Sequence, residues 1–327
     1  MHALDAQGAV PLAVLERDGF PESQHLGAAV VLDPDGERLA AHGDVDARIY
    51  PRSALKLFQT VAAEEAGARL SPEQQVIVSA SHSGTARHVE LVRSVLTDAG
   101  LDEETLRTPP AWPMDEKARF ALVRAGGSPR RITMNCSGNH AGMLAGAAAA
   151  GWPVEDYLAA GHPIHALAAE VITRTSGTDL TDRGRDGCGG PVWAMPLTAL
   201  ARGYQRLLAE HPGLAAAIRA FPDLIEGPGT PTTRAVGGLG VVAKAGAEGV
   251  WVAVAPNGAA VAVKTLDGAN RVPSAVAVAL LAEHGAVDTA AAGAFLADPA
   301  LAISAGGQRA GGLRVTVASA TKENAWH

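Results

Sequence analysis

Aromatic side chains, cysteines and clustered positive charges are all scarce in this sequence. Of its 327 residues, 4% are aromatic and two are cysteines, and the formal net charge is −7. A phosphate backbone is bound by clustered lysines and arginines, so nucleic acid is not expected as a partner. A secreted disulfide framework needs more cysteines, and we therefore predict a cytoplasmic protein.

Long apolar runs are missing as well. Residues 1–14 lack the basic start and the continuous apolar core that are typical of a secretion signal. The apolar stretch over residues 141–152 is too short, and too rich in glycine and alanine, to span a bilayer. We expect no membrane partner and a core that packs on small aliphatic side chains.

Strand and helix patterns occupy different parts of the chain. Strands that form an antiparallel meander are predicted at residues 11–16, 26–32 and 38–41. Segments of helical composition follow at residues 53–66, 72–80, 88–99, 115–125, 140–150, 154–175 and 196–210. Beyond them we predict strands at 250–255 and 259–265 around an Asn-Gly turn, a helix at 271–283 and a strand at 313–318.

This order of strands, helices and strands predicts an α/β (α+β) fold in which both ends of the chain share one antiparallel sheet. The sheet lobe is expected over residues 8–50 and 235–327, and an inserted helical lobe over residues 51–234. The groove between two lobes is a natural place for a functional site.

The first predicted helix opens with a Ser-x-x-Lys pattern formed by Ser53 and Lys56. Lys56 lies one turn after Ser53, on the same helix face. A serine hydroxyl needs a base to act as a nucleophile, and a lysine can serve when burial lowers its pKa. The helix start also favours a developing oxyanion. As a bare pattern, Ser-x-x-Lys is more often a helix cap beside a solvated lysine.

The wider context strengthens the pattern. In penicillin-binding proteins and β-lactamases, Ser-x-x-Lys opens a helix and a Lys-Thr strand closes the site. Here Lys264 and Thr265 end a predicted strand, and residues 137–139 have the Ser-x-Asn form of the middle motif. Because no glycine follows Thr265, the match is partial.

Three further clusters combine hydroxyls, amides and thiols, at residues 79–85, 135–140 and 186–190. Each is explained in isolation by helix caps, glycine turns or small buried cysteines. Four such clusters in one chain favour a functional site.

Several of these motifs, in order along residues 20–270, resemble the rhizobial-type L-asparaginases. The segments that carry the resemblance are residues 22–27, 51–59, 80–84, 136–143, 186–189 and 244–249, together with Lys264 in its strand. The resemblance implies a fold related to the serine β-lactamases and glutaminases. It also implies a homodimer that hydrolyses L-asparagine, a small-molecule amide, to L-aspartate and ammonia.

The resemblance further implies a site made of two Ser–Lys pairs, Ser53 with Lys56 and Ser81 with Lys264. It implies zinc binding through Cys136, Cys188 and a lysine, but Asn139 stands at the position of that lysine. A neutral amine is a far better zinc ligand than an amide, so we predict that zinc binding is weak or absent and that no cofactor is required. His140, Asp186 or water could complete a weaker site.

Charge complementarity assigns contacts to the two charged groups of the substrate. Arg52 is the candidate for the carboxylate, because a guanidinium suits bidentate binding, and Asp186 or Glu22 is the candidate for the ammonium group. The predicted substrate-binding set is completed by His82, Asn139 and His140.

Two segments depart from the family pattern. Residues 226–234 stand where the family has a glycine-rich segment followed by Arg-Phe-Asp-Thr, and residues 305–308 stand where it has Asn-x-Arg-Gly. These departures leave two alternatives open, a relative that acts on another small amide or ester, and an inactive binding protein. Retention of both Ser–Lys pairs argues against the second.

Overall fold

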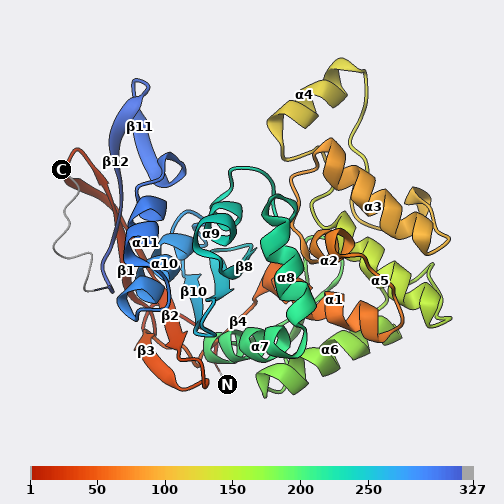
Figure 1. The fold of residues 1–327 in the computed structure, drawn as a ribbon, viewed down its shortest axis with the longest axis horizontal. Coiled ribbons are helices and arrows are strands. Elements are labelled where there is room, and N and C mark those ends of the chain that lie inside the picture. Colours follow the sequence, from red (N-terminus) through yellow and green to blue (C-terminus); the bar gives the residue numbers. More distant parts are fainter. Residues whose placement is uncertain (1, 319–327) are drawn as a thin grey trace.

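The protein, described here by a computed structural model over residues 2–318, is built on one eight-stranded antiparallel sheet (Figure 1). The strand order is β11-β12-β1-β2-β10-β9-β8, and β3 pairs with β2 off this path. The strands are β1 (Val10–Arg17), β2 (Phe20–Leu32), β3 (Arg38–His42), β8 (Val242–Gly246), β9 (Val250–Val254), β10 (Ala260–Thr265), β11 (Ala302–Ala305) and β12 (Gln308–Val315).

The two ends of the chain meet in the middle of this sheet. Strand β2 lies between β1 and β10, and its residues Gly27 to Leu32 pair with Thr265 to Ala260. All of β9 is buried, as is all of β10 except the half-buried Lys264, so both faces of the central strands are covered. Helices α7 (Leu197–Glu210) and α10 (Pro273–Glu283) pack against these two strands. The predicted sheet, formed from both ends of the chain around an inserted helical region, is confirmed.

The inserted region supplies a second layer of helices, drawn to the right of the sheet in Figure 1. Helix α5 is its centre and contacts α1, α2, α3 and α6. Two of its glycines permit this closeness, because a Cβ at Gly138 would lie 2.2 Å from Ile77 O and one at Gly142 would lie 2.2 Å from Val78 Cγ1. The helices are α1 (Lys56–Glu65), α2 (Pro72–Ser79), α3 (Ala86–Asp98), α4 (Glu116–Arg124), α5 (Ser137–Ala149) and α6 (Pro163–Ser176).

Shorter elements complete the described part of the chain. Helices α8 (Pro212–Ala220), α9 (Pro231–Leu239) and α11 (Thr289–Leu296) pack near the sheet, and small two-stranded sheets pair β4 (Arg48–Ile49) with β7 (Met195–Pro196) and β5 (Arg183–Arg185) with β6 (Pro191–Trp193). Single 3₁₀ turns occur at η1 (Arg52–Leu55), η2 (Glu103–Thr105), η3 (Pro222–Leu224) and η4 (Pro299–Leu301).

Three predicted elements were wrong in their bounds. The strand predicted over residues 26–32 begins at Phe20, because β2 pairs with β1 from that residue onward. The helix predicted over residues 154–175 begins only at Pro163, where the imidazole of His162 caps the first turn by accepting a hydrogen bond from Ile164 N. The strand predicted over residues 313–318 runs from Gln308 to Val315, because β12 pairs with both β11 and β1 over that longer range. Helices α8, α9 and α11 and strands β4 to β8 and β11 were not predicted.

The hydrophobic core is divided between two clusters of buried side chains. The larger one joins the sheet to α7, α8 and part of α1, and the smaller one lies among α2, α3 and α5. Helices α7 and α8 thus share a core with the sheet, although the sequence placed them in the helical lobe. The predicted sheet lobe extended to residue 327, and its residues 319–327 lie outside the described part.

Candidate active site

The start of the first helix leaves Ser53 half-buried and buries Lys56. The turn η1 holds Ser53, and α1 begins at Lys56, which is 3% exposed. Just before Ser53, Arg52 adopts a positive φ of 54°, which costs a residue with a side chain roughly 1–2 kcal/mol. Hydrogen bonds from Arg52 Nε (2.9 Å) and Nη2 (2.7 Å) to Asp186 Oδ1 hold the arginine in this conformation.

Edge strand β8 comes directly against this turn. A Cβ at Gly246 would lie 2.2 Å from the carbonyl oxygen of Pro51, so only glycine allows the strand to approach so closely. Side chains two residues apart in a strand point to the same face. Lys244 therefore extends its side chain toward the face on which Gly246 meets the start of the helix.

The amines of two buried lysines meet at the hydroxyl of Ser81. Lys56 Nζ lies 3.1 Å from Ser81 Oγ and Lys244 Nζ lies 3.0 Å from it. Lys56 also donates to the carbonyl of Ala80 at 2.7 Å, and Lys244 to the carbonyl of Ala245 at 2.7 Å. Lys244 is fully buried, and this burial lowers its pKa to about 8. The result is a continuous chain of polar groups, Lys56–Ser81–Lys244.

Backbone hydrogen bonds from two directions fix Ser81. It follows the C-terminal end of α2, and its N–H donates to the carbonyl of Ile225 at 3.0 Å. The next N–H, that of His82, donates to the carbonyl of Asn135 at 3.0 Å. The segments around residues 81, 135 and 225 therefore form one wall.

Lys264 does not lie beside Ser81, as the sequence led us to expect. Its amine donates to the carbonyls of Glu248, at 2.6 Å, and Thr265. Strand β10 is internal to the sheet, whereas β8 is at the edge that faces η1. The partner of Ser81 is Lys244 for this reason, and the predicted Ser81–Lys264 pair is corrected to Ser81–Lys244.

Three predicted substrate contacts instead serve the interior of the helical layer. His82 accepts a hydrogen bond from Gly84 N at Nδ1, which assigns the ring hydrogen to Nε2, and Nε2 lies 2.8 Å from Ser137 Oγ. Asn139 donates to the carbonyl of Val78 at 3.1 Å. His140 contacts Tyr157 Oη at 2.7 Å, and burial lowers its pKa to about 3.

The predicted charged contacts are also engaged elsewhere. Asp186, the candidate for the substrate ammonium group, forms the ion pair with Arg52, the candidate for its carboxylate. Glu22 lies on the exposed start of β2, where it accepts a hydrogen bond of 3.0 Å from Arg17 Nε. None of these three residues is among those that line the cavity beside Ser53.

The two cysteines come together behind Lys56. Both are buried free thiols, and Lys56 Nζ lies 3.2 Å from Cys136 Sγ. A hydrogen bond from Cys188, together with the charge of Lys56, lowers the pKa of Cys136 to about 6, and the same thiol pairing raises the pKa of Cys188.

This arrangement is a poor fit to zinc, which takes four ligands in structural sites. Over residues 2–318 no group of three histidine, cysteine or acidic side chains is placed to hold a metal ion. The amide nitrogen of Asn139 is directed to a carbonyl, so it supplies no third ligand. Two thiols alone make half of a tetrahedral site.

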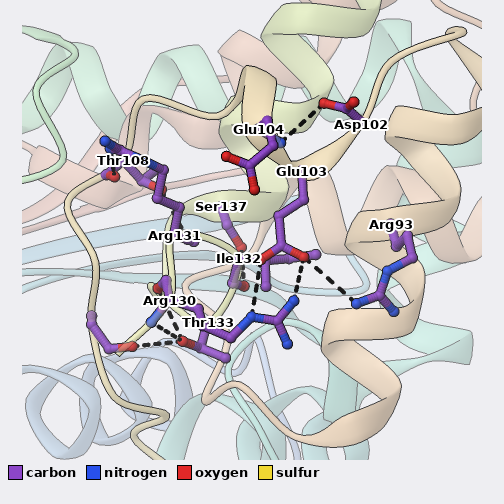
Figure 2. A network of polar contacts seen from close by, with 11 residues as sticks. Arg93, Asp102, Glu103, Glu104, Thr108, Arg130, Arg131, Ile132, Thr133 and Ser137 are labelled. Atoms are coloured by element: carbon purple, nitrogen blue, oxygen red, sulfur yellow. Dashed lines mark hydrogen bonds and ion pairs between the residues drawn. The ribbon is translucent and has the colours of Figure 1, made fainter. Parts of the chain in front are cut away.

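A polar network anchors the segment that leads to Cys136 (Figure 2). Glu103 accepts hydrogen bonds from Arg130 Nε at 3.1 Å and Nη2 at 2.5 Å, and it lies 3.7 Å from Arg93 on α3. Thr133 donates to the carbonyl of Ala111 at 2.5 Å. These contacts tie the chain before α5 to helix α3 and thereby hold Asn135 and Cys136 in place.

A cavity of about 590 Å³ opens onto the two serines. Ser53 and Ser81 line it, and so do residues 245–247 of the edge strand. The other lining residues are Ser83, Met114, Asp115, Glu116, Asn135, Glu226, Gly227, Pro228, Thr230, Pro231, Thr232, Trp251, Asn270 and Ser274. The cavity therefore brings together a candidate nucleophile, the Ser81 hydroxyl that both lysines contact, and an open strand edge.

The sequence of residues 13–315 matches the family model of L-asparaginase II. The chain belongs to the L-asparaginase II family. This membership supports hydrolysis of an amide as the class of reaction. A search of curated proteins gave no match, and no helix within residues 2–318 has the length and apolarity needed to cross a membrane.

Solved structures give a more distant likeness. A β-lactamase from Mycobacterium bovis is 17% identical, with a TM-score of 0.44 over 79% of this chain and 94% of its own. A Bacillus glutaminase is 13% identical, with a TM-score of 0.36 over 80% and 92% of the two chains.

The sequence did not identify two residues of the candidate site, Lys244 and Glu226. Lys244 opens the Lys-Ala-Gly segment, and the glycine two residues later was the available signal, because it marks a close backbone approach. Glu226 lies in the segment that departs from the family pattern, and no local signal points to it.

Proposed function

We propose that the protein hydrolyses the side-chain amide of L-asparagine through an ester of Ser53. The observation that carries the proposal is the Lys56–Ser81–Lys244 chain, whose central residue Ser81 lines the same cavity as Ser53. Family membership supports the amide as the bond that is broken and favours L-asparagine as the substrate.

In the acylation step, Lys56 acts as the base that takes the proton of Ser53, and Ser53 Oγ attacks the amide carbon. The backbone N–H of Ser53 and the open edge of residues 245–247 are the groups available to receive the oxyanion. The C–N bond then breaks, and the leaving nitrogen takes a proton through Ser81 and departs as ammonia. Water resolves the aspartyl ester and restores the Ser53 hydroxyl.

Lys56 and Lys244 are suited to these proton transfers. Burial penalises the charged form of Lys244, and the nearby charge of Lys56 adds to this lowering of the pKa of Lys244. The lowered pKa of Lys244, about 8, keeps its charged and neutral forms close in free energy near neutral pH. Ser81 can thus pass a proton in either direction between Lys56 and Lys244.

Release of ammonia from a panel of amides tests this function. We expect turnover of L-asparagine, and a loss of about 10³-fold or more in Ser53→Ala and Lys56→Met. Ser128→Ala, at an exposed position away from the cavity, is the matched control. If Ser53→Ala retains activity within tenfold of the wild type, the role of nucleophile would be assigned to Ser81 instead.

The same panel separates the two alternatives. The replaced segment 226–234 contributes several residues to the cavity wall, which favours a relative that acts on another small amide or ester as the second candidate. Binding of L-asparagine without ammonia release would instead support an inactive binding protein. The cytoplasmic location and the homodimer stay predictions, and light scattering in solution would test the second.

A further inference from the structure

The lining of the cavity carries negative charge. Asp115, Glu116 and Glu226 line the cavity, and no lysine, arginine or histidine does so within the described chain. The two lysines at Ser81 are only 3% and 0% exposed, and Arg52 is bound to Asp186. The cavity therefore has carboxylates for a cationic ligand and lacks an accessible cation for an anionic one.

Glu226 is held next to the reacting groups by the backbone. The residue before it accepts the hydrogen bond from Ser81 N. The residue after it, Gly227, has a φ of 146°, and a Cβ there would lie 2.3 Å from Ser83 Oγ. The half-buried Glu226 carboxylate acts electrostatically on Lys244, which places its charge within reach of the Ser81 centre.

Asp115 is tied to the same wall from the other side. Its backbone N–H donates to the carbonyl of Ser83 at 2.7 Å, and its side chain caps α4. Ser83 thus bridges the segments that carry the two carboxylates.

Two serine hydroxyls are buried in the lining of the cavity. The side-chain oxygens of Ser83 and Ser274 are buried, and neither has a hydrogen-bond partner among residues 2–318. Ser274 is 3% exposed, so bulk water does not compensate for the missing partner. A buried hydroxyl without a partner that lines a cavity is an independent sign that a polar ligand binds there.

We propose that Glu226 receives the ammonium group of the substrate and that the site requires no free carboxylate, so that its substrates are small amides bearing a primary ammonium group. This inference rests on the proposed amide hydrolysis and names its substrate class. L-Asparagine meets the requirement through its α-ammonium group. Its carboxylate contributes little, because the accessible charges around it repel an anion.

Two analogues of L-asparagine separate the charged groups. β-Alaninamide keeps the amide and the ammonium group and lacks the carboxylate, whereas succinamic acid keeps the amide and the carboxylate and lacks the ammonium group. We expect kcat/KM for β-alaninamide to be within about threefold of that for L-asparagine, or higher. For succinamic acid we expect it to be at least about 30-fold lower, since an ionic hydrogen bond is lost and a repulsion is gained.

The variant Glu226→Gln removes the charge and keeps the shape. We expect KM for β-alaninamide to rise at least about tenfold, with a smaller change in kcat, and the preference over succinamic acid to shrink by a similar factor. Glu226→Asp should restore part of the preference. Glu90→Gln, at an exposed position on α3, is the matched control and should change neither parameter.

Calorimetric binding of β-alaninamide and succinamic acid to the full-length Ser53→Ala chain completes the test. If the wild type hydrolyses none of the amides but still binds β-alaninamide through Glu226, the proposed function fails and the inference stands. If succinamic acid is bound or hydrolysed as well as β-alaninamide, or Glu226→Gln leaves the preference unchanged, the inference is overturned and amide hydrolysis is not.

Discussion

Lys244 Nζ lies 3.0 Å from Ser81 Oγ, although the two residues come from opposite sides of the site. Ser81 follows α2 in the helical region, and Lys244 lies on the edge strand β8 of the sheet. The hydrogen bond therefore joins the inserted helical region to the sheet. Because Lys56 reaches the same hydroxyl from the first helix, one serine joins two lysines of different origin.

The two strand lysines should differ sharply in their effect on activity. Lys244→Met removes one end of the Lys–Ser–Lys chain, and we expect ammonia release to fall by about 10²- to 10⁴-fold. Lys264→Met removes only hydrogen bonds to the carbonyls of Glu248 and Thr265 and should retain activity within about tenfold. Steady-state kinetics of both variants, with folding checked by circular dichroism, decide between them. A larger loss in Lys264→Met would restore the pairing first expected from the sequence.

Gly246→Ala should separate the edge strand from the start of the first helix. The added Cβ would lie 2.2 Å from Pro51 O, and backbone must move to relieve the clash. We expect a loss of about 2–3 kcal/mol in the free energy of unfolding and a large loss of activity.

The matched control is Gly238→Ala in α9, where a Cβ would meet nothing within 4 Å. Alanine favours a helix over glycine by up to about 1 kcal/mol, so this variant should be neutral or slightly more stable in urea denaturation. Equal losses from both substitutions would show that the close approach of Gly246 to Pro51 is unimportant.

Burial of Lys244 predicts a characteristic dependence of stability on pH. Its pKa falls from 10.5 to about 8 in the folded protein, so between these values the unfolded chain binds more protons at this residue. The free energy of unfolding therefore increases as the pH rises through this window, by up to about 3 kcal/mol. Urea denaturation at pH 8 and pH 10.5 should show a larger gain in the wild type than in Lys244→Met, because the variant lacks the contribution of Lys244. A difference between the two proteins that does not change with pH would contradict the lowered pKa.

Zinc content tests the substitution at Asn139. Protein purified without chelator should contain well under one zinc ion per chain, because Cys136 and Cys188 supply only two good ligands. Asn139→Lys should increase the zinc content measured by elemental analysis, since an amine becomes available near both thiols. One tightly held zinc ion per wild-type chain would show that the amide at this position does not prevent binding.

Local sequence patterns were sufficient for much of the fold and for one side of the site. Strand alternation and turn chemistry located β1 to β3, β9 and β10, and the Ser-x-x-Lys pattern located Ser53 and Lys56 at the start of α1. These features depend on neighbours along the chain, which a single sequence displays directly.

The rest depended on which distant segments meet. Lys244 and Lys264 both lie on strands of one sheet, and only the strand order shows that β8, not β10, is the edge next to η1. Arg52 and Asp186 form an ion pair although they lie 134 positions apart in the sequence. Because the sequence does not reveal this pair, each residue was assigned to a charged group of the substrate. No periodicity encodes such a pairing.

The most direct test of the central claim is to identify the residue that carries the acyl group. We would mix the enzyme with excess L-asparagine, quench it in acid within the first turnover and map the modified peptide by mass spectrometry. The account predicts an aspartyl ester on Ser53 in the wild type and none in Ser53→Ala. An ester on Ser81, or turnover with no ester on either serine, would contradict it.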